Sequence, residues 1–152
     1  MSVEVGDVAP DFELRDQHGA PVRLSAHRGG KVVLVFYPLA FSGICHGELS
    51  AIRDEFLPTV GDDVRVFAVS VDSVFALRAW SDQERYTFPL LSDFWPHGGV
   101  ARAYGVFDDE KGVAKRGTFV IDAEGVVRWK VVNPTSTARD ISEYHKALAE
   151  IS

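Results

Sequence analysis

Two runs of β-branched and other apolar residues dominate the hydrophobic pattern of the chain, at residues 32–36 and 64–71. Most of the apolar residues in these runs occupy consecutive positions. This pattern is typical of strands that are buried on both faces, as in a parallel sheet with helices outside it. The pattern therefore predicts two central strands of a sheet.

Two hairpins are predicted near the two ends of the chain. Residues 117–122 and 126–132 flank the turn sequence Asp-Ala-Glu-Gly, and this spacing predicts an antiparallel pair. A weaker signal of the same kind joins residues 11–14 to residues 22–24. We therefore expect a mixed sheet with an N-terminal β-hairpin.

Helical periodicity falls between these strands. One apolar stripe predicts a helix that ends at Pro58, and it consists of Cys45, Leu49, Ile52 and Phe56. Ser73 is a suitable N-cap for a second helix, and a last helix is expected from about Ala138 to Ile151. Strands that alternate with helices indicate an α/β fold. The order of elements resembles a thioredoxin-like domain, with a mixed central sheet flanked by helices.

Composition and charge narrow the function classes. The chain has 152 residues, of which 46% are hydrophobic and 25% are charged, so one folded domain over residues 1–152 is expected. The net charge of −6 disfavours nucleic acid or an anionic membrane as a partner. Without a signal-peptide pattern or a membrane-length apolar run, a cytoplasmic location is expected. The five histidines lack the spacing of metal ligands, so neither a metal nor a cofactor is expected.

The chain contains one cysteine, Cys45, which excludes an intrachain disulfide. It opens the first predicted helix, where unpaired N–H groups and the helix dipole favour a thiolate, the nucleophilic form. The alternative is an inert core residue, because Cys45 is in register with Leu49 and Ile52 and free cysteines are commonly buried. Periodicity alone favours this alternative.

The loop before Cys45 favours a reactive cysteine over an inert core residue. Pro38, Ser42 and Cys45 have the spacing P-x-x-x-S-x-x-C, which lets one loop wrap over the helix start and bring the Ser42 hydroxyl near the sulfur. This pattern resembles the active-site motif of peroxiredoxins, with Ser in place of the commoner Thr. Residues 8–12 and 115–122 are similar to two other peroxiredoxin signatures. The resemblance extends from about residue 3 to the C-terminus.

Residues 41–45 and 91–98 are similar to the one-cysteine alkyl hydroperoxide reductase E subfamily of actinobacteria. The resemblance implies a thiol-dependent peroxidase that acts through a Cys45 sulfenic acid. It leaves the preferred substrate open among hydrogen peroxide, alkyl hydroperoxides and peroxynitrite.

The resemblance also implies a role for each residue of the site. Arg116 stabilises the Cys45 thiolate and polarises the O–O bond, and the Ser42 hydroxyl contacts the peroxide, because developing negative charge needs donors that are already in place. Pro38 shields the sulfur from water, and Glu48 orients an arginine. Taken by itself, Arg116 would more simply be an exposed charge before a strand.

The single cysteine also constrains how the sulfenic acid is reduced. Ser50 stands where some peroxiredoxins have a second, resolving cysteine, and no cysteine follows Cys45. A partner must therefore reduce the sulfenic acid. The resemblance implies mycothiol with a mycoredoxin, or thioredoxin, as the reductant, and a homodimer as the assembly.

Two other function classes use the same cysteine differently. A redox sensor or chaperone would form the sulfenic acid but would turn over negligibly with any reductant. An inert thioredoxin-like binding module would resist peroxide altogether.

Histidine and aromatic residues outside the motif are interpreted separately. His46 is expected to be solvated, since adjacent helix positions point apart. Residues 95–97 either line the substrate mouth or form a packed aromatic turn. Trp80 and Trp129 are expected in the core.

Overall fold

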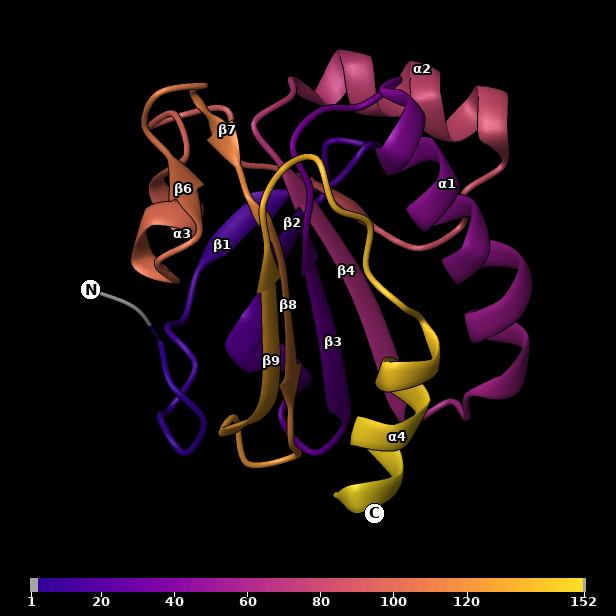
Figure 1. Ribbon diagram of the computed structural model, residues 1–152, viewed down its shortest axis with the longest axis vertical. Coiled ribbons are helices and arrows are strands. Elements are labelled where there is room, and N and C mark those ends of the chain that lie inside the picture. The colour runs from indigo at the N-terminus through magenta and orange to yellow at the C-terminus, as the bar shows by residue number, and fades with distance from the viewer. Residues whose placement is uncertain (1–2, 152) are drawn as a thin grey trace.

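The computed structural model describes residues 3–151 (Figure 1). The strands are β1 (Glu13–Arg15), β2 (Pro21–Arg23), β3 (Lys31–Phe36), β4 (Val64–Ser70), β5 (Leu90–Ser92), β6 (Phe107–Asp108), β7 (Val113–Ala114), β8 (Arg116–Ile121) and β9 (Val127–Asn133). The helices are η1 (Leu24–His27), α1 (Gly43–Ala51), η2 (Ile52–Phe56), η3 (Leu57–Thr59), α2 (Val74–Glu84), α3 (Gly99–Ala103) and α4 (Ser142–Glu150).

Seven strands form a central mixed sheet in the order β2-β1-β5-β4-β3-β8-β9. Strands β3, β4 and β5 are parallel, whereas β8 runs antiparallel to both β3 and β9. The predicted α/β fold with a mixed sheet and an N-terminal hairpin, β1–β2, is therefore confirmed. Because β3, β4 and β5 are parallel, their carboxyl ends lie along one edge of the sheet.

Helices cover both faces of the sheet. On one face α1, α2 and α4 pack against alternate strand residues such as Val33 and Val35, while η1 and α3 pack on the opposite face over Val32 and Leu34. The central residues of β3 are fully buried, as expected for a strand covered on both sides. Trp80 lies in the core at 1% exposure. Trp129 is partly buried and packs against the same core cluster.

The structure differs from the sequence expectation at two helices. The first helical segment does not end at Pro58, because α1 continues through the π-helical turn η2 into η3, which ends at Thr59. Pro58 lies in the first turn of η3, where a backbone N–H donor is not needed. The last begins at Ser142 instead of about Ala138, and Asp140 accepts the Ser142 N–H at its start (2.9 Å). The Ser73 N-cap is confirmed by a hydrogen bond from Ala76 N to its Oγ (3.2 Å).

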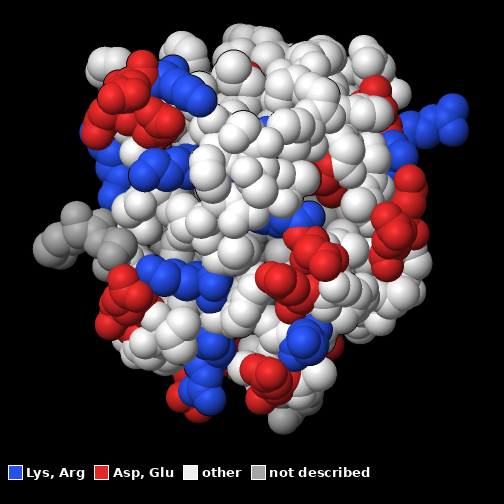
Figure 2. All heavy atoms as spheres, viewed as in Figure 1, with Lys and Arg blue, Asp and Glu red and all other residues white. Residues whose placement is uncertain are grey.

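Charge is spread over the surface. On the face shown in Figure 2, acidic and basic side chains are interspersed, and basic residues form no continuous patch. Among residues 3–151, no helix is long and apolar enough to span a bilayer.

Candidate active site

Cys45 is the third residue of α1 and is fully buried. Its stripe partners Leu49, Ile52 and Phe56 are also buried, at 0–2% exposure. The predicted helical face is therefore confirmed, and the cysteine is a core residue. Its sulfur also accepts a hydrogen bond from Arg116. A buried position in the core therefore does not exclude a reactive cysteine.

The start of α1 presents backbone donors around the cysteine. The first helical hydrogen bond runs from His46 N to Ser42 O (2.8 Å), so the N–H groups of residues 43–45 precede the intrahelical ladder. These groups and the positive end of the helix dipole favour negative charge at this turn.

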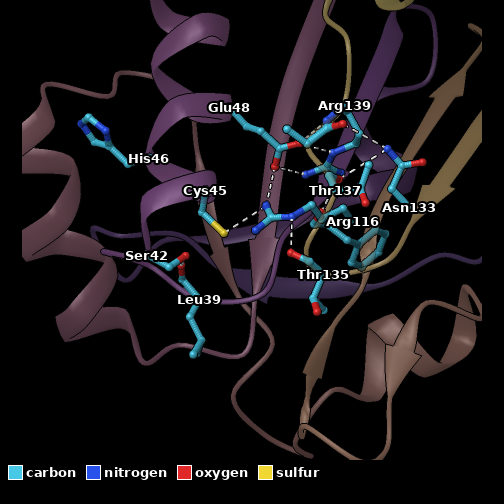
Figure 3. Close-up of polar contacts among 12 residues, drawn as sticks. Leu39, Ser42, Cys45, His46, Glu48, Arg116, Asn133, Thr135, Thr137 and Arg139 are labelled. Carbon is cyan, nitrogen blue, oxygen red and sulfur yellow. Dashed lines mark hydrogen bonds and ion pairs between the residues drawn. The ribbon is translucent and has the colours of Figure 1, made fainter.

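Arg116 donates from Nη1 to the Cys45 sulfur at 3.3 Å (Figure 3). The antiparallel pairing of β8 with β3 explains this contact, because it places the start of β8 beside the end of β3 and hence beside the active-site loop. Arg116 is 3% exposed, so it is not the surface charge that its sequence position alone would suggest. A guanidinium donor on a buried sulfur stabilises the thiolate.

Glu48, one turn after Cys45, binds two arginines. Its Oε1 accepts from Arg116 Nη1 (2.6 Å) and Arg139 Nη2 (2.8 Å), and its Oε2 accepts from the backbone N and Nε of Arg139 (2.7 and 2.9 Å). Burial acts to raise the Glu48 pKa, but the Arg139 hydrogen bonds and the charges of both arginines outweigh it and hold the pKa below its usual value. Glu48 is therefore a carboxylate that fixes the Arg116 guanidinium.

Arg139 is a member of the site that the sequence pattern does not reveal. Its side chain is 2% exposed, and Nη1 donates to the carbonyls of Phe36 (2.7 Å) and Gly117 (2.9 Å) and to Thr118 Oγ1 (3.1 Å). The residue falls where a helix was expected, so no periodic or spacing signal marks it. In the sequence, Arg139 is recognisable only as a basic residue that follows the last strand.

The four ionisable groups balance when Cys45 is ionised. Two arginines face one carboxylate, which leaves one positive charge in a buried cluster if the cysteine is a thiol. Buried charges are stable when they are paired. A negative charge on the Cys45 sulfur would complete this pairing.

The loop lies on the other side of the sulfur. Pro38 is buried, and Ser42 is the N-cap residue of α1, although its Oγ donates to Leu39 O (2.8 Å) instead of capping the helix. The structure therefore brings Ser42 to the helix start, but its hydroxyl does not bond to Cys45. While its proton is held by Leu39, the hydroxyl oxygen can accept a hydrogen bond from an incoming peroxide.

His46 lies away from the sulfur, and residues 95–97 are exposed. His46 points away from Cys45 in Figure 3, and its Nε2 is hydrogen-bonded to Glu84 Oε1 (2.8 Å), so its ring is only half-exposed. Trp95 is 80% exposed, which contradicts a packed aromatic turn at that position. Among residues 3–151, no cluster of three or more His, Cys, Asp or Glu side chains could hold a metal.

Comparison with known proteins agrees with this geometry. Residues 5–130 match the AhpC/TSA family. The chain belongs to this family of peroxiredoxins. It is 47% identical over 151 residues to alkyl hydroperoxide reductase E of Mycobacterium tuberculosis and of Mycobacterium bovis, with 99% of each chain covered.

Solved structures show the same fold. The crystal structure of Enterococcus faecalis AhpC aligns with a TM-score of 0.88 at 27% identity, covering 99% of this chain and 92% of that one. The crystal structure of peroxidoxin BcpB from Mycobacterium tuberculosis aligns with a TM-score of 0.80 at 33% identity, covering 98% of this chain and 96% of that one. This peroxiredoxin is a thiol-dependent peroxidase, as the sequence motifs predict.

Proposed function

We propose that this peroxiredoxin reduces hydrogen peroxide, alkyl hydroperoxides and peroxynitrite at Cys45 and depends on an external thiol to complete its cycle. The observation that carries the proposal is the 3.3 Å contact between Arg116 Nη1 and the sulfur of the only cysteine, at a helix start. An inert binding module would have no use for a charged donor aimed at a buried sulfur.

In the first step the Cys45 thiolate attacks one peroxide oxygen. The S–O bond forms as the O–O bond breaks. The leaving hydroxide or alkoxide takes up a proton to become water or an alcohol, and peroxynitrite releases nitrite. Cysteine is thereby oxidised to the sulfenic acid, and the peroxide is reduced by two electrons. Arg116 and the N–H groups of the first helical turn stabilise the negative charge as it moves to the leaving oxygen.

Ser42 and Pro38 act from the loop side of the sulfur. The Ser42 oxygen accepts a hydrogen bond from the peroxide O–H and so orients the oxygen that is attacked. Pro38, buried beside the helix start, limits access of bulk water to the sulfur.

In the second step an external thiol condenses with the sulfenic acid to give a mixed disulfide and water. A further thiol then releases Cys45 by thiol–disulfide exchange. Mycothiol with a mycoredoxin, or thioredoxin, would supply these thiols. We also place the protein in the cytoplasm, where such reductants keep thiols reduced.

A homodimer is part of the proposal. Exposed apolar side chains surround the start of α1, and they include Leu39 (43%), Phe41 (52%) and Ile44 (39%). Apolar groups gathered at one place on a surface commonly mark an interface. Sedimentation at several protein concentrations would test this assembly.

Stopped-flow tryptophan fluorescence tests the peroxidase proposal. Trp80 is buried and lies 6.0 Å from the ring of Phe41 in the active-site loop, so oxidation of Cys45 should change its emission. We expect a rate proportional to peroxide concentration, with sustained turnover only when a thiol reductant is present. Oxidation without turnover under any reductant would instead indicate a redox sensor.

A further inference from the structure

A second polar cluster bonds to the active-site loop and consists of Ser70, Asp72 and Ser92. At its centre is Asp72, between β4 and α2, whose Oδ2 accepts the backbone N–H of Ala40 at 2.7 Å. Ala40 lies midway between Pro38 and Ser42. The carboxylate thus holds the centre of the loop that the peroxidase step requires.

Asp72 is itself held in place from two strands. Ser70 Oγ at the end of β4 donates to the same Oδ2 (2.6 Å) and accepts the Asp72 N–H (3.3 Å). Ser92 Oγ at the end of β5 donates to the Asp72 carbonyl (2.6 Å). Ser70 is 1% exposed, so this anchor belongs to the rigid edge of the sheet.

The loop packs only partly into the core, so a further anchor helps to fix it. Leu39 and Phe41 are about half exposed, and Phe41 has φ = 67°, a left-handed conformation that is unfavourable for a bulky residue. The hydrogen bond from Ser42 Oγ to Leu39 O joins one part of the loop only to another. The bond from Ala40 to Asp72 connects the strained turn to the sheet.

Tyr37 joins the end of β3 to the active-site loop and is fully buried. Burial raises its pKa well above the usual value, and the negative charges of Asp72 and Cys45 act in the same direction, opposed by Ser70. Both charges therefore act on one fully buried phenol that packs 5.6 Å from Trp80. Asp72 thus bonds to the loop at Ala40, and Cys45 packs with Tyr37 in the same core cluster.

We propose that Asp72 is a positioning residue for peroxide reduction, one that holds Ala40 and thereby fixes Pro38 and Ser42 over the Cys45 sulfur. It does not touch the peroxide. The inference rests on the proposed roles of Pro38 and Ser42. It assigns to the loop side an anchor comparable to the one that Glu48 provides for Arg116.

Two reactions of Cys45 separate positioning from general stability. Reaction with hydrogen peroxide needs the loop in place, whereas alkylation by iodoacetamide needs only a reachable thiolate. Asp72→Ala should slow oxidation by about 10-fold or more, since small misplacements of orienting groups have large effects on rate. Its alkylation should be unchanged or faster. Asp72→Asn should recover most of the oxidation rate, because the amide oxygen still accepts from Ala40 N.

Asp82→Ala is the matched control, since this carboxylate lies on α2 with a 69% exposed side chain. Oxidation of Asp72→Ala at the rate of this control, or an equal loss in both reactions, would overturn the proposal. If Asp72→Ala does not fold, Ser70→Ala tests the same carboxylate oxygen and should slow oxidation alone, and equal rates would again overturn the proposal. A wild-type protein that fails to reduce peroxide would instead contradict the proposed function.

Discussion

The two sides of the Cys45 sulfur are built in different ways. On one side lie Arg116, Glu48 and Arg139, whose side chains are 3%, 7% and 2% exposed and are joined by hydrogen bonds of 2.6–2.9 Å. On the other side lies a short loop with half-exposed apolar side chains and a strained backbone at Phe41. One side is buried and charged, and the other is half-exposed and mostly apolar.

The difference indicates a division of labour. In the proposed mechanism the charged side stabilises the negative charge of the reaction, and its members are also part of the packed interior. In the same mechanism the loop side admits the peroxide and orients it. Substitutions on the charged side should therefore impair both rate and stability, whereas those on the loop should mainly change the rate.

The largest effect is expected where the two sides meet. Cys45→Ser should abolish peroxidase activity, because the hydroxyl is not an equivalent nucleophile. Ser50→Ala should leave activity nearly intact, since Ser50 Oγ bonds to the Tyr86 hydroxyl (3.0 Å) and not to the site. A coupled peroxidase assay compares the two variants. Loss of activity in Ser50→Ala would mean that the site extends further along α1.

On the charged side, Arg116→Lys should reduce the rate constant with peroxide by about 10²-fold or more. A guanidinium reaches the Cys45 sulfur, Glu48 and the Thr135 carbonyl (2.8 Å from Nε) at once, and a single ammonium cannot reproduce this fork. Stopped-flow rates measure the loss. A variant within about threefold of wild type would remove Arg116 from the mechanism.

On the loop side, Ser42→Ala should slow oxidation by roughly 10-fold, since it removes the hydrogen bond that orients the peroxide. Ser42→Thr keeps the hydroxyl and should keep most of the activity. Chemical denaturation should show smaller changes for both variants than for Arg116→Lys. If Ala matched Ser in rate, the hydroxyl would have no part in the step.

The last effect concerns pH and appears in stability instead of in rate. Because the pKa of Glu48 is lowered on folding, its contribution is fully present above the unfolded value and is lost as pH falls through the lower folded value. The free energy of unfolding should therefore fall below about pH 4.5. Glu48→Gln should be less stable at neutral pH by about 3 kcal/mol and should show a weaker acid dependence. An unchanged acid dependence would show that Glu48 is not the group responsible.

Local sequence patterns account for much of this architecture. The strand runs, the Ser73 cap and the position of Cys45 follow from periodicity and spacing, which depend on near neighbours in the chain. Arg139 could not be found in this way, because its role depends on contacts with Glu48 and Phe36, which are far away in the sequence. The same long-range contacts hold residues 138–140 where a longer helix was expected. The short pair β6–β7 has too few residues to give a pattern.

The central claim is that Cys45 is oxidised to a sulfenic acid that no group in the chain can resolve. Intact mass under non-reducing conditions, after one equivalent of peroxide, tests it most directly. We expect each chain to gain one oxygen atom, located at Cys45, and to remain so until a small thiol converts it to a mixed disulfide. Rapid and complete conversion to a Cys45–Cys45 disulfide dimer that supports turnover would contradict the account and indicate resolution between subunits.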